Sequence, residues 1–209
     1  FNVNSSVLIP RADSELLVEE SLAWIKNQQI KNTHLLDIGT GSGCLCLSLL
    51  KLNKNISAQA WDISTDAIEI AKSNQKKLLI KDERIKFKIK DALAPNSYCK
   101  KTDKKFDLII SNPPYIGERE KKDLSKDVIN YEPHSALFAD KNGLLFYETL
   151  AQHAGKILMH NAAIFVELST TISCEIIEIF KSYKWQNLKT FEDISKKPRV
   201  LRAIRPKDY

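Results

Sequence analysis

The sequence has little cysteine and no long apolar run. Its four cysteines, Cys44, Cys46, Cys99 and Cys174, form no CxxC pair and have no histidine partner at zinc spacing, so we expect reduced thiols in a cytoplasmic protein. No stretch reaches the roughly 18 apolar residues of a membrane span, and no signal-peptide pattern is present. With 43% hydrophobic and 28% charged residues among 209, the composition predicts one globular domain and excludes a disordered tail or a fibre.

Arginine is also scarce, because only 6 of the 32 basic residues are arginine and the other 26 are lysine. Against 26 acidic residues this gives a net charge of +6, which is compatible with a nucleic acid or a ribosome-associated partner. The lysines are scattered, however, which favours genome base composition as their cause. We therefore expect no direct nucleic-acid binding and no membrane partner.

Apolar periodicity predicts alternating strands and helices. The predicted strands cover residues 34–38, 57–61, 85–89, 106–110, 162–168, 185–191 and 199–204. The predicted helices run from a cap at Asp13 or Ser14 to Ile25 and over 44–52, 64–79, 144–158 and 171–183. Residues 1–12 are predicted to form a β-hairpin that leads into the domain. The polar segment 116–140 shows few periodic features, which in compact domains is typical of a functional segment.

This alternation predicts an α/β fold with a mostly parallel, seven-stranded sheet and helices on both faces. A short loop around 196–198 joins the last two strands, so that end of the sheet is expected to be antiparallel. In such sheets the ligand lies beyond the carboxyl ends of the strands. Polar or glycine-rich signals at 37–43, Asp62, Asp91 and Asn112 each follow a strand, which predicts one site at this edge.

The first signal is the turn over 37–43, which reads DIGTGSG. Glycines allow a tight turn and close approach of a ligand, and the following helix N-terminus offers amide donors. The turn differs from the dinucleotide pattern G-x-G-x-x-G because Cys44 stands at the sixth position. A bare strand-to-helix turn is the alternative, but Asp37 favours a ligand, since an acid there can hold the amino group of an amino-acid-like molecule.

Two further acids follow the next two strands. Asp62 can accept both hydroxyls of a ribose, or it can be a plain N-cap for the helix from Ser64. Asp91 can accept the exocyclic amine of an adenine, or it can be a solvated loop residue. The glycine turn upstream favours ribose binding for Asp62.

The most specific signal is Asn112-Pro113-Pro114-Tyr115, directly after a buried strand. Two prolines stiffen the chain and remove two amide donors, so the carbonyls of Asn112 and Pro113 are held outward. With the Asn112 side chain as a further acceptor and the Tyr115 ring to stack on, the string suits a planar NH2 group. The alternative, a rigid turn with a packed tyrosine, fits this position less well.

Together these signals resemble the class I S-adenosylmethionine-dependent methyltransferases that methylate planar nitrogens. The string over 7–15, VLIPRADSE, resembles the Ile-Pro-Arg-Pro-Glu/Asp-Thr-Glu string of HemK-type protein-glutamine methyltransferases, which modify the Gly-Gly-Gln loop of peptide chain release factors. Further matches are YEP at 131–133, ALFA at 136–139, the residues around 143–147, and PRV at 198–200. The resemblance spans essentially the whole chain and implies a Rossmann-like class I methyltransferase fold.

The sequence departs from the family pattern at a few places. Ala12 stands where the family has proline, and Ala92 where many relatives have an aromatic residue. The segment 168–171 replaces a glycine-rich turn. The family's N-terminal helical domain is absent from this chain, so we expect the hairpin over 1–12 and a methyltransferase domain over 13–209.

The resemblance implies S-adenosylmethionine as the cofactor, S-adenosylhomocysteine as its product, no metal, and peptide chain release factors as the protein substrate. The implied cofactor-binding residues are Asp37, Gly39, Thr40, Gly41, Ser42, Gly43, Asp62, Ile63, Asp91, Ala92 and Asn112. The implied catalytic residues are Asn112, Pro113 and Tyr115. The implied substrate-binding residues are Pro10, Arg11, Asn112, Pro113, Pro114 and Tyr115.

Three other functions share parts of this pattern. Methylation of an exocyclic base amine in DNA or RNA would use the same pocket, but it needs a target-recognition domain for a flipped base, for which 209 residues leave little room. Methylation of a glutamine in a large-subunit ribosomal protein uses a similar core with a different string after Ile-Pro-Arg. A non-enzymatic binding module would bind cofactor without transfer, which the intact residues 112–115 argue against.

Overall fold

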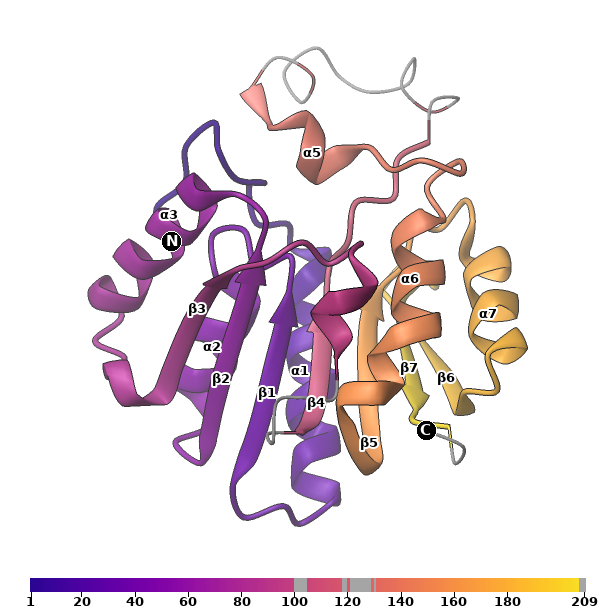
Figure 1. The fold of residues 1–209 in the computed structure, drawn as a ribbon, viewed down its shortest axis with the longest axis horizontal. Coiled ribbons are helices and arrows are strands. Elements are labelled where there is room, and N and C mark those ends of the chain that lie inside the picture. Colours follow the sequence, from indigo (N-terminus) through magenta and orange to yellow (C-terminus); the bar gives the residue numbers. More distant parts are fainter. Residues whose placement is uncertain (100–104, 118–119, 121–128, 130, 207–209) are drawn as a thin grey trace.

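The computed structural model describes residues 1–99, 105–117, 120, 129 and 131–206. Within these ranges seven strands form one sheet in the order β3-β2-β1-β4-β5-β7-β6 (Figure 1). The strands are β1 (Thr33–Ile38), β2 (Ile56–Asp62), β3 (Ile85–Ile89), β4 (Phe106–Ser111), β5 (Leu158–Glu167), β6 (Gln186–Glu192) and β7 (Pro198–Ile204). The α-helices are α1 (Asp13–Asn27), α2 (Cys44–Leu52), α3 (Thr65–Lys77), α5 (His134–Leu137), α6 (Leu145–His153) and α7 (Ser173–Ser182). The 3-10 helices are η1 (Asp82–Arg84), η2 (Pro95–Tyr98) and η4 (Ala154–Ile157).

The strand directions confirm the predicted sheet. Neighbouring strands from β3 to β5 pair in parallel, whereas β7 pairs antiparallel with both β5 and β6. The strands β1, β4 and β5 lie inside the sheet and read as nearly continuous apolar runs, because both of their faces are covered. The predicted α/β fold with an antiparallel end is therefore the observed one.

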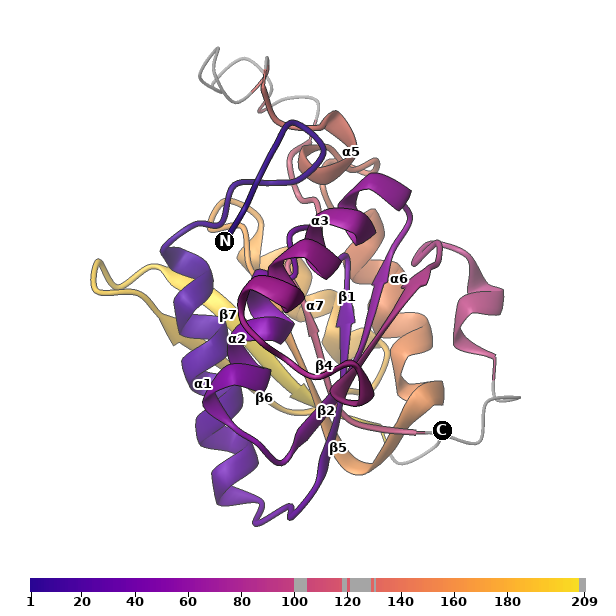
Figure 2. The ribbon, with the colours of Figure 1, turned by 90° about the vertical axis from the view of Figure 1, so that its left-hand side faces the viewer.

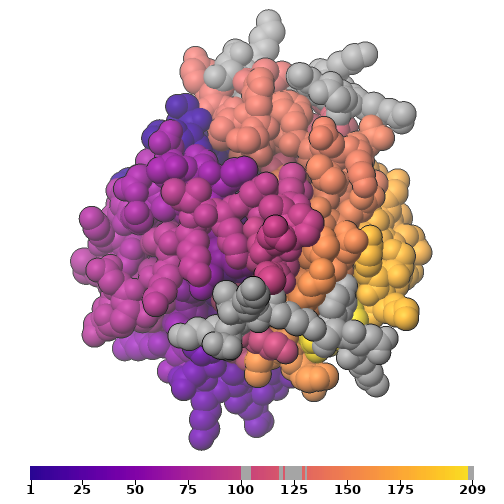
Figure 3. Space-filling model, in the orientation of Figure 1, coloured from indigo at the N-terminus to yellow at the C-terminus, as the bar shows by residue number. Residues whose placement is uncertain are grey.

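Helices cover both faces of the sheet, as Figure 2 shows with α1 and α2 on one side and α6 on the other. One apolar layer packs α1 and α2 against the sheet, with Leu17 and Leu47 fully buried. The other layer packs α6 and α7, with Tyr147 and Phe180 fully buried. Figure 3 shows the second side from outside, where η2 and its flanking residues adjoin α6. None of the helices in the described part of the chain is long and apolar enough to cross a membrane.

The predicted N-terminal β-hairpin is wrong. Residues 1–12, all of which the structure describes, contain no strand and are held instead by a turn and by α3. The backbone N–H of Asn2 donates to Asn74 Oδ1 at 2.6 Å, and Asn74 Nδ2 donates back to the Asn2 carbonyl at 2.9 Å. Because these backbone groups find partners on a helix side chain, they are not available for strand pairing.

Two predicted helix boundaries also differ from the structure. The N-cap of α1 is Ala12, which makes no side-chain cap, and Ser14 bonds elsewhere. The predicted helix over 144–158 ends early, because α6 stops at His153 and Leu158 already begins β5. Leu158 pairs with Phe106 across an irregularity in the β4–β5 register, which extends the strand beyond the residues whose pattern predicts it. Tertiary pairing thus decides that boundary.

The carboxyl ends of β1 to β4 meet at one edge of the sheet. The N-terminal segment and α5 lie over this edge in both ribbon views (Figures 1 and 2). Part of the long polar segment predicted at 116–140 lies outside the described residues, which here are 116–117, 120, 129 and 131–140. The described remainder includes α5, whose residues help to enclose the edge.

Candidate active site

Two cavities meet at the carboxyl edge of the sheet. The cavity called here the cofactor cavity has a volume of about 330 Å³ and lies against the glycine turn and the ends of β2 and β3. The cavity called here the amide cavity has a volume of about 410 Å³ and lies against Tyr115 and the end of β5. The residues that line both cavities are Leu8, Arg11, Asn112 and Ala136. Asn112 therefore stands in the wall that the two cavities share.

The glycine turn forms the floor of the cofactor cavity. Gly39 and Gly41 have φ angles of +74° and +53°, and a Cβ atom built on either would meet nothing within 4 Å. Gly43, with φ of +79°, is instead needed for packing, because its Cβ would lie 2.8 Å from Leu47 Cδ1. The two outer glycines thus leave an open surface on which a ligand can approach the backbone.

The amide donors of this turn are largely used by the protein itself. The N–H groups of Gly39 and Thr40 both donate to the Trp61 carbonyl at 2.9 Å, and Gly43 N–H donates to the Thr40 carbonyl at 2.8 Å. Gly41 N–H donates to Asp62 Oδ2 at 2.8 Å. The turn is therefore fixed to β2. It allows a ligand to come close to the backbone, but few of its N–H groups are free to donate to that ligand.

Asp37 lies beneath the turn instead of on the cavity wall. Its side chain is fully buried, and Oδ2 accepts a hydrogen bond from Thr40 Oγ1 at 2.7 Å. Burial raises its pKa to about 6, and Oδ1 has no hydrogen-bond partner among the described residues. A buried carboxylate oxygen without a hydrogen-bond partner is stabilised by a cationic neighbour. That Asp37 contacts a ligand amino group remains a prediction.

Asp62, Ile63, Asp91 and Ala92 all line the cofactor cavity, as the sequence predicts. Asp62 Oδ1 accepts from Ser64 N–H at 2.9 Å, while the N-cap of α3 is Ser64, so the plain-cap alternative for Asp62 does not hold. Each Asp62 oxygen accepts one backbone hydrogen bond and keeps capacity for another. Asp91 Oδ1 accepts from Leu93 N–H at 2.8 Å, which holds its loop and leaves Oδ2 for a ligand.

The residues 112–115 alternate between the two cavities. Pro114 lines the cofactor cavity, whereas Pro113 and Tyr115 line the amide cavity, and Asn112 lines both. The end of β4 is held in place because Ser111 Oγ donates to the Ile38 carbonyl of β1 at 2.8 Å. Burial raises the pKa of Tyr115 to about 12, so its phenol stays neutral at neutral pH. The predicted acceptors and aromatic ring are thus brought together at one point.

Arg11 also lines both cavities, while Pro10 lines the cofactor cavity alone. Arg11 Nη2 donates to Glu132 Oε1, which belongs to a buried acid that precedes α5. The Glu132 side chain is only 3% exposed, against 41% for Arg11. This pair ties the N-terminal segment to the residues before α5 and so joins the two parts that cover the site.

Sequence reasoning missed three side chains of the site, namely Ser14 in the cofactor cavity and Glu167 and Arg199 in the amide cavity. Glu167 and Arg199 line the amide cavity, and Arg199 forms ion pairs with Asp13 at 3.1 Å and Asp193 at 2.8 Å. Glu167 is 3% exposed and accepts from Ser14 Oγ at 2.5 Å. The signal that could have found Glu167 is its place directly after the apolar run 162–166 of β5, where an acid is out of pattern.

Comparison with known proteins agrees with this geometry. The chain matches the family model described as Methyltransferase small domain over residues 12–158. It is 37% identical to the release factor glutamine methyltransferase of Flavobacterium psychrophilum, over 97% of this chain and 70% of that relative. The chain belongs to the release factor glutamine methyltransferase family. The resemblance carried by residues 7–15 and 112–115 is thereby confirmed.

Other members of this methyltransferase group differ in length. The relative from Clostridium acetobutylicum is 36% identical over 98% of this chain and 70% of its own length. A protein of Rickettsia typhi named as a bifunctional methyltransferase is 37% identical over 96% of this chain, yet the match covers only 41% of that relative. The chain thus spans 70% of the first two relatives and 41% of the bifunctional one.

Solved structures show the same fold. The ribosomal protein L11 methylase of Lactobacillus delbrueckii subsp. bulgaricus matches with a TM-score of 0.64 and 18% identity, over 96% of this chain and 82% of that one. The magnesium protoporphyrin IX methyltransferase of Synechocystis, solved with bound S-adenosylmethionine, matches with a TM-score of 0.58 and 15% identity, over 92% of this chain and 80% of that one. The fold of this family member is that of the class I S-adenosylmethionine-dependent methyltransferases.

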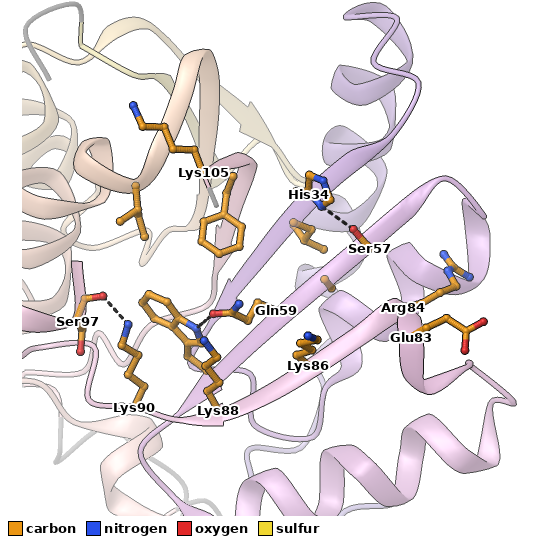
Figure 4. Close-up of a pocket in the computed structure, with 15 residues that line it drawn as sticks. His34, Ser57, Gln59, Glu83, Arg84, Lys86, Lys88, Lys90, Ser97 and Lys105 are labelled. Atoms are coloured by element: carbon orange, nitrogen blue, oxygen red, sulfur yellow. Dashed lines mark hydrogen bonds between the residues drawn. The ribbon is translucent and has the colours of Figure 1, made fainter. Parts of the chain in front are cut away.

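A third cavity, of about 420 Å³, lies on the face of the sheet over β1, β2 and β3 (Figure 4). The basic side chains in its wall are Arg84, Lys86, Lys88, Lys90 and Lys105. Arg84 donates to the Asn53 and Ile56 carbonyls, and Lys90 Nζ donates to the Ser97 carbonyl at 2.6 Å. None of residues 112–115 lines this cavity, which is therefore separate from the predicted site.

Proposed function

We propose that this protein transfers a methyl group from S-adenosylmethionine to the side-chain amide nitrogen of the glutamine in the Gly-Gly-Gln loop of peptide chain release factors. The observation that carries the proposal is the position of Asn112 in the wall shared by the cofactor and amide cavities. Membership in a family named for this reaction supports it. The reaction uses no metal in this proposal, and we place it in the cytoplasm, where translation termination occurs.

The residues of the cofactor cavity fit S-adenosylmethionine. The open faces of Gly39 and Gly41 admit a ligand against the backbone, and Asp62 keeps acceptor capacity for ribose hydroxyls. Ile63 and Ala92 offer apolar contact for a base, with Asp91 as an acceptor for its amine. The orphaned Asp37 Oδ1 suits a cationic amino group near the turn. When bound, the cofactor supplies a methyl group on a cationic sulfur, which makes that methyl electrophilic and leaves S-adenosylhomocysteine as the product.

The chain's own residues solve the problem that an amide nitrogen is a poor nucleophile. The side-chain oxygen of Asn112 and the carbonyl of Pro113 accept the two N–H bonds of the substrate amide, which removes rotational freedom. They also stabilise the positive charge that develops on nitrogen. Tyr115 packs its ring on the amide plane, and its neutral phenol takes no part as a base. The proton leaves to solvent during or after transfer.

The test is transfer of a labelled methyl group. The assay offers S-adenosylmethionine with a release factor, the same factor with its loop glutamine changed to alanine, a large-subunit ribosomal protein, and a DNA and RNA pool. We expect label on the unchanged factor and none on its alanine variant. Label on nucleic acid or on the ribosomal protein instead would reject this substrate. Cofactor binding without transfer to any of the four would identify a binding module.

A further inference from the structure

Glu167 is a buried acid in the wall of the amide cavity with no role in the mechanism above. It ends β5, is 3% exposed, and its Oε2 accepts a hydrogen bond from Ser14 Oγ at 2.5 Å. Ser14 lies in the first turn of α1 and is also buried. An acid in such a place destabilises the folded protein, because burial disfavours its charged form. A functional role would explain why the acid is there.

The hydrogen bonds continue from Ser14 to Asn112. Asn112 Nδ2 lies 3.3 Å from Ser14 Oγ, and the Asn112 side chain also bonds to Glu167. Three segments far apart in the sequence, the start of α1, the end of β4 and the end of β5, thus contribute one connected network. Its last member is the residue that faces both cavities.

The network fixes which way the Asn112 amide points. An ionised carboxylate can only accept, so the single hydroxyl hydrogen of Ser14 is given to Glu167. The Ser14 oxygen then has only lone pairs to offer, so the Asn112 atom that faces it must be the donor Nδ2. Asn112 Oδ1 is left for the opposite side, where an acceptor is needed for a substrate N–H.

We propose that Glu167 is a positioning residue that acts both directly and through Ser14 to present the Asn112 side-chain oxygen, rather than its NH2 group, to the substrate amide. The inference rests on the proposed function, because it assigns the orientation of the acceptor on which that reaction depends. Glu167 itself accepts no substrate hydrogen bond in this scheme. Its effect is on the geometry of Asn112 and hence on kcat.

The scheme makes the orientation depend on the protonation of Glu167. Burial raises the pKa of Glu167 to about 7. The charged and titratable groups that face it are Asp13 on α1, Arg199 on β7, Tyr115 after β4, Tyr147 on α6 and Cys44 on α2.

A protonated Glu167 can donate a hydrogen bond to the Ser14 oxygen. Ser14 can then donate its own hydroxyl hydrogen to Asn112, so that the acceptor Oδ1 faces Ser14 in place of Nδ2. The NH2 group of Asn112 then faces the substrate and repels its N–H bonds. We therefore expect kcat to rise with pH through about 7, where Glu167 loses its proton.

The first experiment compares Glu167→Gln and Ser14→Ala with wild type in the release factor assay over pH 6 to 9. We expect kcat at high pH to fall about tenfold in each variant, the size of one lost hydrogen bond, with little change in KM. The rise of kcat through pH 7 should be absent from Glu167→Gln. Cofactor affinity of Glu167→Gln, measured by calorimetry, should be unchanged because Glu167 does not line the cofactor cavity.

The matched control for Ser14→Ala is Ser21→Ala. Ser21 is a second buried serine of α1, and its Oγ has no hydrogen-bond partner in the described part of the chain. We expect wild-type kcat and pH dependence from this control. Equal kcat and an equal pH profile in wild type and Glu167→Gln would overturn the positioning role.

A second experiment needs no release factor and so separates this inference from the proposed function. The side-chain NH2 signals of Asn112 are assigned in an NMR spectrum of labelled protein by their loss in Asn112→Ala. We expect them to shift with a midpoint near pH 7 in wild type and to stay fixed in Glu167→Gln. Signals that do not respond to pH in wild type would reject the coupling. A wild-type enzyme that titrates as expected but methylates no release factor would reject only the proposed substrate.

Discussion

The two cavities that meet at Asn112 are built in different ways. The cofactor cavity is lined mainly by the residues that follow β1, β2, β3 and β4, and it is closed by the N-terminal segment and by residues around α5. The residues that line the amide cavity are Leu8, Arg11, Asn112, Pro113, Tyr115, Ile116, Glu120, Ala136, Leu137, Glu167, Ser169, Thr170, Thr171 and Arg199. Sheet topology therefore places most of the first cavity, whereas Glu120 and Arg199 reach the second only in the complete fold.

Their polar contacts follow the same division. In the cofactor cavity, Asp62 and Asp91 each accept from the backbone N–H two residues further along the chain, and Asp62 also accepts from the Gly41 N–H of the glycine turn. Other polar side chains of the site pair across the sequence: Arg11, which lines both cavities, pairs with Glu132, and Glu167 of the amide cavity pairs with Ser14. A backbone partner survives most substitutions, but a side-chain partner does not. We therefore expect the amide side to be more sensitive to single mutations.

The largest effect should come from the residue that belongs to both cavities. Asn112→Ala is expected to lower kcat by about two to three orders of magnitude, the scale of one positioned catalytic hydrogen bond. Cofactor affinity should change little, since Asp62 and the glycine turn remain. Methyl-transfer kinetics and calorimetry measure the two quantities, with Asn27→Ala at the end of α1 as a surface control. Near-wild-type turnover in Asn112→Ala would remove Asn112 from the mechanism.

A pair of glycine variants compares how tightly each side is packed. A Cβ at Gly143 would lie 2.1 Å from the Tyr115 carbonyl oxygen, and its φ is +89°. We expect Gly143→Ala to lower the free energy of unfolding by about 3 kcal/mol through strain and overpacking. Gly41→Ala meets nothing within 4 Å at φ of +53°, so it should cost only about 1 kcal/mol. Urea unfolding measures the free energy of unfolding of both variants. Equal losses would contradict the expectation that the backbone around Gly143 is packed more tightly than that around Gly41.

Each cavity is also accompanied by one buried acid with a raised pKa, and the pH dependence of unfolding distinguishes the two acids. The pKa of Asp37 is raised from 3.8 to about 6, so the folded state holds this proton more tightly than the unfolded chain. Its contribution to stability is complete below pH 3.8 and is lost as pH rises through about 6. At pH 8 we expect Asp37→Asn to raise the free energy of unfolding by about 2 kcal/mol.

The matched variant on the amide side is Glu167→Gln, whose window runs from pH 4.5 to about 7. Asp66→Asn on the surface of α3 is the control. Unfolding curves measured from pH 4 to 8 give the three profiles. An Asp37→Asn variant that loses stability at pH 8 would mean that the carboxylate has a cationic partner in the folded protein.

The smallest expected effect is on the cofactor side. Asp62→Ala should weaken S-adenosylmethionine binding about tenfold, the size of a lost hydrogen bond to a charged acceptor. Tyr115→Phe, which changes only the amide cavity, should leave that affinity as it is. Calorimetry measures the affinity of both variants for S-adenosylmethionine. Unchanged affinity in Asp62→Ala would reduce Asp62 to a residue that holds the glycine turn.

The spacing of apolar residues predicts much of the fold, because it decides which face of a helix or strand is buried. The helix over 44–52 and the strand over 85–89 match α2 and β3 residue for residue, since their apolar spacing decides the element. The hairpin over 1–12 fails because Asn2 finds its partners on Asn74, 72 residues away. The early start of β5 is missed because it depends on pairing with Phe106 of β4.

The difference between local patterns and long-range contacts also applies to the candidate site. The sequence by itself determined the sheet, the edge at which the two cavities lie and the part of the cofactor cavity that follows β1 to β4, because each of these follows a strand end within one connection. Only the tertiary structure decided that Arg11 pairs with Glu132, that Asp37 lies beneath its turn, and that Ser14 and Glu167 hold Asn112. Contacts between segments more than 90 residues apart leave no periodic trace in the chain, so they are fixed only when the whole core has packed.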